Sequence, residues 1–167
     1  MRPVQIAPSV LPVDFSKLGE AITALDAAGV DLIQWDVMDG QFVPNLTFGP
    51  DVIASTRHLT KKPFEAHLMV LTPDVMAKRY VEAGCQRLIV HAEACDHLHR
   101  TLGNIRELGA TAAVALNPGV IHTDMLASCF AESASEYPTP EEWIKTAGPF
   151  ILKISPRDNG RPLTVPC

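Results

Sequence analysis

The sequence predicts an α/β fold: half of a parallel (β/α) barrel followed by an irregular α/β tail. Short apolar runs alternate with helix-like segments at a period of about 25 to 30 residues over the first 118 positions. The runs are nearly continuous rather than alternating, which is typical of parallel strands covered on both faces. At 167 residues the chain is shorter than a complete eight-stranded barrel, which typically needs about 250 residues.

Five apolar segments are predicted as parallel strands of one sheet. They are Val4–Ser9, Leu32–Val37, Phe64–Met69, Arg87–His91 and Thr111–Leu116. Polar side chains stand at or just past the ends of four of these runs: Ser9, Asp36 with Asp39, His67 and His91. A (β/α) barrel builds its site from such strand ends, so we expect these side chains to share one face.

Helical segments separate the predicted strands, and a glycine follows each of them. These segments and their glycines are Ala21–Ala28 with Gly29, Val75–Ala83 with Gly84, and His97–Leu108 with Gly109. Thr72 and Pro73 precede the second segment as an N-cap and a first-turn proline. Proline just inside the start and glycine just past the end are the expected boundaries of a helix.

The tail after residue 118 differs in character from the first part. Ser133–Pro140 is small and polar and is predicted to be a loop, while Thr139–Glu142 has the pattern of a helix start. Pro149–Ile154 is predicted as a helix end or a short strand, and Arg161–Val165 as a final strand. About 50 residues cannot bury a core of their own, so residues 119–167 are not expected to form an independent domain beside the half barrel of residues 1–118.

Composition excludes several classes of function. The net charge is −5 and no basic cluster is longer than the pair Lys61-Lys62, which disfavours nucleic acid and anionic membrane as partners. No apolar run approaches the roughly 20 residues of a membrane span, and the N-terminus lacks a secretory signal pattern. Four cysteines show no Cys-x-x-Cys spacing and are expected to be free thiols of a cytoplasmic protein: Cys85, Cys95, Cys129 and Cys167.

Residues 4 to about 118 resemble ribulose-phosphate 3-epimerase along their whole length. The motifs that carry this resemblance are Ile6-Ala-Pro-Ser9, Asp36-Val-Met-Asp-Gly40, Phe42-Val-Pro-Asn45 and His67-Leu-Met69. The resemblance implies a TIM-type barrel of the ribulose-phosphate binding kind. It also implies a sugar-phosphate substrate and a metal-dependent epimerase, which interconverts D-ribulose 5-phosphate and D-xylulose 5-phosphate by removing a proton next to the ketone.

The same resemblance implies roles for individual residues. Asp36 corresponds to a catalytic base that is also a metal ligand, and His67 to a second ligand that also contacts substrate. Ser9, Met38 and Met69 correspond to substrate-binding residues. The cofactor implied is a divalent cation, namely zinc, manganese, iron or cobalt.

Two departures weaken the expected activity. Gln34 stands where the family usually has a histidine ligand, and an amide oxygen is a poor ligand for zinc-like metals, so metal binding is expected to be weakened. The family's second catalytic aspartate and its glycine-rich phosphate loops have no counterpart motif in this sequence. Loss of an acid or base costs on the order of 10²–10⁴ in rate, so we expect activity to be lost or very low.

The tail resembles the C-terminal part of a short-chain dehydrogenase/reductase through Asn117-Pro-Gly-Val-Ile-His-Thr-Asp-Met125, which suggests a chimera. Thr123 would then contact the nicotinamide end of the cofactor. However, the sequence has no glycine-rich dinucleotide fingerprint, and neither Tyr80 nor Tyr137 has a lysine four residues later. NAD(P) binding is therefore not expected.

Three alternatives stay open from the sequence: an epimerase by descent, a non-enzymatic recombinant or fragment that acts at most as a binding or oligomerising module, and an NAD(P)-dependent reductase. Open edges of a half barrel favour self-association, so a homo-oligomer is expected. A further group of potential zinc ligands matches no zinc module in its spacing: His91, Cys95, His97 and His99.

Overall fold

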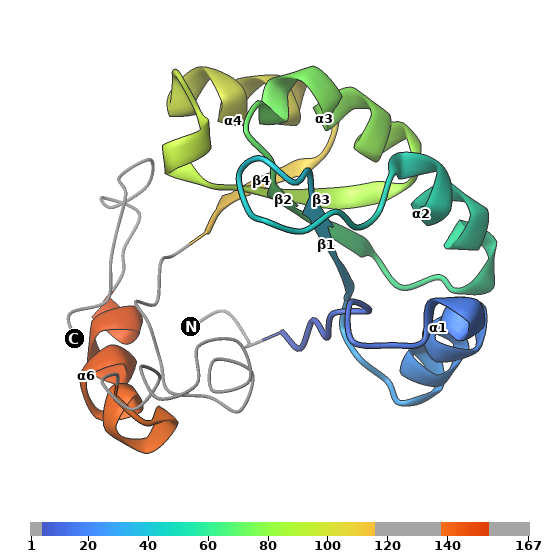
Figure 1. Ribbon diagram of the computed structural model, residues 1–167, viewed down its shortest axis with the longest axis horizontal. Helices are drawn as coiled ribbons and strands as arrows, with labels where there is room; N and C mark the ends of the chain where they lie inside the picture. The colour runs from blue at the N-terminus through green and yellow to red at the C-terminus, as the bar shows by residue number, and fades with distance from the viewer. Residues whose placement is uncertain (1–4, 116–137, 154–167) are drawn as a thin grey trace. The chain divides into compact units, whose positions relative to one another are not determined.

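The computed structural model describes residues 5–115 and 138–153 (Figure 1). The chain divides into two units, Met1–Ala115 and Leu116–Cys167, and each is described by itself. Several predicted features lie outside the described residues: Val4, Leu116, most of the Ser133–Pro140 loop, the segment Asn117–Met125 with Thr123, the strand Arg161–Val165, Cys129 and Cys167.

The first unit is built on a four-stranded parallel sheet. Its strands are β1 (Ile33–Met38), β2 (Phe64–Met69), β3 (Cys85–Val90) and β4 (Thr111–Val114). They lie in chain order, each pairing in parallel with the next. Strands in chain order joined by helical crossovers are the arrangement of a partial (β/α) barrel, so the predicted fold class is confirmed.

Val4–Ser9 was predicted as the first strand, and this prediction is wrong: residues 5–9, the described part of the segment, do not form a regular strand. Ser9 makes a single parallel bridge to Gln34, with Gln34 N–H donating to Pro8 O and Val10 N–H to Gln34 O. Leu32 N–H also donates to Ile6 O, at 3.2 Å. To continue this parallel ladder toward the N-terminus, residue 8 would have to donate a backbone N–H to β1. Residue 8 is a proline, which has no N–H. The segment therefore follows β1 without becoming a continuous strand.

Helices connect the strands. They are the 3₁₀ turn Phe15–Lys17, α1 (Leu18–Ala27), α2 (Pro50–Thr56), the 3₁₀ turn Arg57–Leu59, α3 (Pro73–Glu82), the 3₁₀ turn Ala92–Ala94 and α4 (Leu98–Glu107). The three predicted helices are confirmed, and Gly29, Gly84 and Gly109 follow them with positive φ angles. Thr72 is the N-cap residue of α3, but its side chain makes no capping hydrogen bond. Helix α2 was not predicted from the sequence, although Pro50 in its first turn is a helix-start signal.

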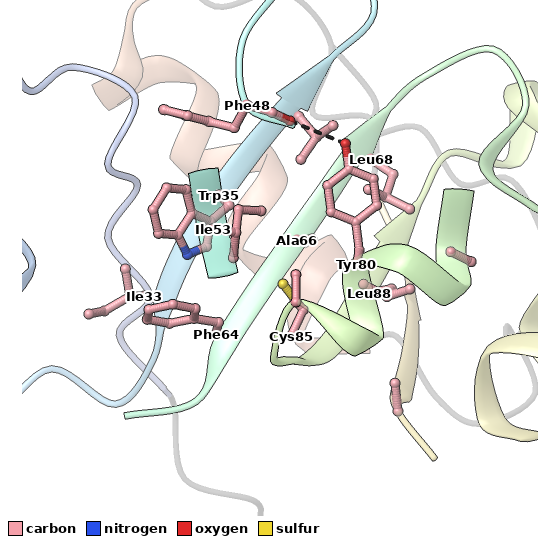
Figure 2. Packing of buried hydrophobic residues seen from close by; sticks show 14 of the residues in the cluster. Ile33, Trp35, Phe48, Ile53, Phe64, Ala66, Leu68, Tyr80, Cys85 and Leu88 are labelled. Carbon is pink, nitrogen blue, oxygen red and sulfur yellow. Dashed lines mark hydrogen bonds between the residues drawn. The ribbon is translucent and has the colours of Figure 1, made fainter. Parts of the chain in front are cut away.

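Strand alternation separates an apolar face from a polar one. In β1, Ile33, Trp35 and Val37 join the hydrophobic core, while Gln34 and Asp36 point to the opposite face, which we call the inner face. Figure 2 shows the core between the strands and their helices. Trp35 meets Phe48 edge-on with ring centroids 5.1 Å apart and Phe64 at 5.4 Å. Tyr80 closes this cluster by donating its hydroxyl to Phe48 O (Figure 2).

The described part of the second unit is the helix α6 (Pro140–Lys153). Its start is the predicted one, because Thr139 and Glu142 form a reciprocal capping box. Thr139 N–H donates to Glu142 Oε2 at 3.0 Å, and Glu142 N–H donates to Thr139 Oγ1 at 3.3 Å. Pro149 lies inside this helix, so the alternative of a short strand beginning at Pro149 is wrong.

Two further observations concern thiols and membranes. Cys85 and Cys95 are free thiols, the former buried. Burial raises the pKa of Cys85 to about 12, although the nearby Arg57 opposes this, so its thiol is unreactive at neutral pH. Within the residues that the structure describes, no helix has the length and apolarity to cross a bilayer.

We expect Leu88→Ala to lower the free energy of unfolding by about 2–5 kcal/mol, because the side chain of Leu88, a residue of β3, is fully buried in the hydrophobic core. Leu46→Ala is the matched control, since Leu46 is 77% exposed, and it should change stability by less than about 0.5 kcal/mol. Urea unfolding followed by circular dichroism measures both. Equal effects of the two substitutions would contradict the assigned core.

Candidate functional site

Four polar side chains from neighbouring segments meet on the inner face. Asp36 of β1 is the register partner of His67 of β2, Ser9 lies beside β1, and His91 directly follows β3. Each is brought there by strand pairing, because parallel strands in register align side chains of equal parity on one face. The predicted meeting of these four strand-end residues is what the structure shows.

Asp36 is the centre of the hydrogen-bond network. Its Oδ1 accepts from Gln34 Nε2 at 2.9 Å and lies 3.0 Å from His67 Nδ1. Its Oδ2 accepts from the hydroxyl of Ser9, which itself accepts from Leu11 N–H at 3.0 Å. The Asp36 side chain is only 12% exposed, so these three donors replace the water that the carboxylate loses on burial.

The network keeps Asp36 ionised. Burial raises the pKa of the Asp36 carboxyl, but the hydrogen bonds from His67, Ser9 and Gln34 together outweigh burial and hold the pKa below its usual value. Asp36 is therefore a carboxylate at neutral pH, the form that a general base requires.

An ionised carboxylate only accepts hydrogen bonds, so the Nδ1 of His67 carries the proton that faces Asp36. The Nε2 of His67 lies 2.8 Å from the Nε2 of His91. When His67 is neutral its Nε2 is an acceptor, and His91 is then the donor. Burial, together with the nearby His67, lowers the pKa of His91 against the opposing effect of Glu93, which favours the neutral form of His91.

Met38 and Met69, predicted to line the substrate, are register partners two pairs beyond Asp36 and His67. Both are partly exposed and lie at the ends of β1 and β2, on the same face by strand alternation. The structure thus brings together six predicted site residues on one face: Ser9, Gln34, Asp36, Met38, His67 and Met69.

Asp39, the other carboxylate after β1, does not join them. Its side chain accepts backbone hydrogen bonds from Gln41 and Phe42 in its own loop and from Leu71 in the loop after β2. These backbone donors outweigh the effect of desolvation and lower the pKa of Asp39. The expectation that both carboxylates belong to the site is corrected: Asp39 joins two loops, and Asp36 alone faces the site.

The loop after β1 is also tied back to the strand. Thr47 donates its hydroxyl to Asp36 O at 2.5 Å and accepts from Met38 N–H at 3.0 Å. Gly40 takes a φ of 74°, a left-handed conformation that glycine adopts without steric cost, and its N–H donates to Asn45 O. The Asp39–Asn45 segment therefore has a structural part in shaping the site.

A second polar pair, which was not predicted from the sequence, lies one layer further along the inner face. Glu65 is almost fully buried and accepts from Arg87 Nη1 at 2.9 Å. Arg87 also donates to Gln5 Oε1 at 2.8 Å. The signal was present, since Glu65 interrupts an apolar strand two residues before His67 and so shares its face.

A cavity of about 330 Å³ opens beside the site, between the loop after β1 and helix α3. Met38, Thr47, Phe48, Met76 and Tyr80 are among its lining residues. It includes neither Asp36 nor His67, so it is a neighbour of the hydrogen-bond network and not the place where the carboxylate acts.

The predicted metal ligands Gln34, Asp36 and His67 are joined to one another by hydrogen bonds. Both ring nitrogens of His67 and the Oδ1 of Asp36 are already engaged in hydrogen bonds. Within the described ranges no three His, Cys, Asp or Glu side chains form a group that could hold a metal ion. The same result excludes the zinc site considered at His91, Cys95, His97 and His99. Cys95 donates to the backbone oxygen of His91, and both His97 and His99 are exposed.

Comparisons with known proteins agree with the motifs. The model of the ribulose-phosphate 3 epimerase family matches residues 5–132. Ribulose-phosphate 3-epimerase of Synechocystis sp. is 50% identical over 117 residues, which are 69% of this chain and 51% of that protein. The Bacillus subtilis enzyme is 47% identical over 115 residues, 69% of this chain and 53% of that protein.

The chain thus spans about half the length of these curated relatives. Orotidine 5'-monophosphate decarboxylase from Methanocaldococcus jannaschii has a similar fold, with a TM-score of 0.51 and 16% identity over 79% of this chain and 62% of that one. The family match extends past residue 118, the predicted join, and these comparisons give no support to a reductase-like tail.

We expect Asp39→Asn to destabilise the protein by about 1 kcal/mol, because an amide nitrogen in place of Oδ2 cannot accept from Leu71 N–H. Since the pKa of Asp39 is lowered on folding, its contribution is present above the pKa of the unfolded chain. It is lost as the pH falls through the lower, folded-state pKa.

Thermal unfolding between pH 7 and pH 2 tests this directly. The parent should lose part of its advantage over Asp39→Asn in acid. Asp51→Asn is the control, since Asp51 has an exposed side chain that pairs with Arg79 only. A constant difference between parent and Asp39→Asn across the whole range would contradict the assigned role.

Proposed function

Because the chain belongs to the ribulose-phosphate 3-epimerase family, we propose that its site removes a proton from the carbon next to the ketone of a pentulose 5-phosphate. The substrate pair is D-ribulose 5-phosphate and D-xylulose 5-phosphate. The observation that carries this proposal is the buried, ionised Asp36, held by three hydrogen-bond donors on a face shared with the partly exposed Met38 and Met69.

Asp36 Oδ2 is the atom that accepts the proton. Oδ1 already accepts from Gln34 and His67, which uses both of its lone pairs, whereas Oδ2 accepts from Ser9 alone. As the C–H bond breaks, its electron pair moves toward the carbonyl carbon and the carbonyl oxygen gains negative charge, giving an enediolate. Met38 and Met69 supply apolar surface that excludes water beside this intermediate.

Inversion at that carbon needs a second acid on the opposite side. Among the described residues, the other carboxylate on the inner face is Glu65, which is held by Arg87. We therefore propose that this chain removes and returns the proton on one side, while full epimerisation is lost or reduced by roughly the 10²–10⁴ that one acid/base group contributes.

Proton exchange separates these two steps. Incubation of D-ribulose 5-phosphate with the protein in D₂O should replace the C3 proton by deuterium, seen by proton NMR, with little D-xylulose 5-phosphate in a coupled assay. Asp36→Asn should abolish the exchange, and Asp51→Asn, an exposed substitution, should leave it unchanged. Exchange by Asp36→Asn at the parent rate would contradict the proposal.

We also propose that a divalent cation, namely zinc, manganese, iron or cobalt, binds only weakly at Asp36 and His67, with Gln34 nearby. The cation must displace hydrogen bonds that both side chains already make, and an amide is a poor ligand for such metals. No catalytic step is assigned to it.

Calorimetry with Zn²⁺ or Mn²⁺ should give a small binding signal that shrinks further in Asp36→Asn. The Asp51→Asn protein serves again as the control. Binding by Asp36→Asn as strong as that of the parent would place the cation elsewhere.

Self-association is the second candidate function, and the sheet edges favour it. In the described residues β1 and β4 are the terminal strands of the sheet, and β1 is flanked by a segment that bridges it at Ser9 alone. Unpaired strand edges tend to pair with another chain. We propose a homodimer or larger assembly, alongside the sugar phosphate as the small-molecule partner.

Light scattering at micromolar concentration should show a mass above that of the single chain, 18.1 kDa. A stable monomer that binds no dye for exposed apolar surface would contradict this prediction. The reductase-like tail and the cytoplasmic location stay predictions; a fluorescence titration with NADPH should show no binding.

A further inference from the structure

His91 has no part in the proton transfer proposed above, yet its Nε2 lies 2.8 Å from the Nε2 of His67. We propose that His91 is a positioning residue for cation binding. When a divalent cation binds the Nδ1 of His67, the Nε2–H of His67 donates to the Nε2 of His91, and this hydrogen bond fixes the direction of the Nδ1 lone pair. The inference rests on the cation binding proposed for Asp36 and His67 and deepens it.

The side of the His67 ring that would meet a cation is the side that faces Asp36. His67 Nδ1 lies 3.0 Å from Asp36 Oδ1, a separation that two ligands of one cation can have when each bond is about 2.0–2.2 Å long. Within the described residues no third His, Cys, Asp or Glu side chain joins this pair. Because so few side chains hold the cation, its affinity depends strongly on the orientation of each.

The opposite side of the His67 ring supplies that orientation. A neutral imidazole has one N–H and one bare nitrogen, so binding of a cation through Nδ1 places the proton of His67 on Nε2. The acceptor for this proton is the Nε2 of His91, 2.8 Å away. A hydrogen bond at the second nitrogen sets the tautomer and the ring orientation of a metal-binding histidine. The two rings lie within 21° of parallel, with centroids 5.0 Å apart.

His91 is itself held in place from several sides. Its backbone oxygen accepts from Ala94 N–H at 3.2 Å and from Cys95 Sγ at 3.2 Å, at the start of the 3₁₀ turn after β3. The ring of Phe42, from the loop after β1, packs at a centroid distance of 5.0 Å. Glu93 Oε2 lies 3.9 Å from the Nδ1 of His91. An acceptor fixed in this way presents a fixed direction to His67.

The hydrogen bond between the two rings reverses when a cation binds. In the metal-free protein His91 donates to His67, because the proton of His67 lies on the Nδ1 that faces Asp36. On binding, the shared proton moves from the Nε2 of His91 to that of His67, and the Nδ1 proton of His67 leaves to water. The Nδ1 of His91 takes up a proton from water, on the side where Glu93 lies. Each ring carries one proton before and after, so the exchange balances.

This reversal is visible by NMR. The full chain, labelled with ¹⁵N in its histidine rings, is compared after treatment with EDTA and after saturation with Zn²⁺, and the His67→Gln protein assigns the signals. With Zn²⁺, His67 should be protonated on Nε2, His91 should be protonated on Nδ1, and a scalar coupling should join the two Nε2 atoms. A Zn²⁺-saturated protein in which His67 keeps its proton on Nδ1 would overturn the proposal, as would the absence of this coupling.

Calorimetry with Zn²⁺ at one pH provides the second readout. His91→Ala should bind Zn²⁺ roughly 10- to 100-fold more weakly than the parent, the loss typical when the hydrogen-bond partner of a metal-binding histidine is removed. His91→Gln should stay close to the parent, because its amide oxygen can accept from His67. His99→Ala, an exposed control on α4, should match the parent.

The glutamine variant separates a positioning role from direct binding of the cation by His91. An amide is a poor ligand for zinc-like metals, so a loss in His91→Gln as large as that in His91→Ala would overturn the proposal. Binding by His91→Ala as tight as that of the parent would also overturn it. If circular dichroism shows that His91→Ala does not fold, the parent spectra and His91→Gln decide the matter.

A failure of the proposed proton transfer would look different. It would appear as deuterium exchange that persists in Asp36→Asn, a result that changes neither the Zn²⁺-bound spectrum of His67 in the parent nor the order of Zn²⁺ affinities among the His91 variants.

Discussion

The site depends on the burial of one carboxylate. Taking Asp36 out of water costs several kcal/mol unless donors replace the lost hydration. Here the donors come from three places: Gln34 in the same strand, His67 in the next strand and Ser9 in the segment that bridges β1. These three hydrogen bonds therefore join the segment around Ser9 to strands β1 and β2.

Because successive side chains of a strand point to opposite faces, strand β1 contributes both to the hydrophobic core and to the polar inner face. The residues of β1 that face the helices, Trp35 among them, pack into the aromatic and aliphatic core, and their neighbours supply the polar inner face. Asp39 and Thr47 then fix the loop beyond the strand through backbone hydrogen bonds. The core supplies the rigidity that a hydrogen-bond network needs to hold its geometry.

The departure at Gln34 has a consistent physical meaning. Its amide donates to Asp36 Oδ1, a bond that a bound metal ion would compete with. On the far side of the His67 ring, the Nε2 of His67 lies 2.8 Å from the Nε2 of His91. Hydrogen-bond partners within the protein thus surround the Asp36–His67 pair.

The sequence by itself determined the fold class, three of the helices, the strands β1 to β4 and the residues that meet at the site. Long apolar runs and helix boundaries are local signals, and strand parity places Asp36 and His67 on one face. Only the tertiary structure decided that Pro8 ends the ladder beside β1, that Asp39 turns to the Leu71 loop, and that His91 reaches the Nε2 of His67. These outcomes depend on which donor lies within about 3 Å of which acceptor, a distance set by chain segments far apart in sequence.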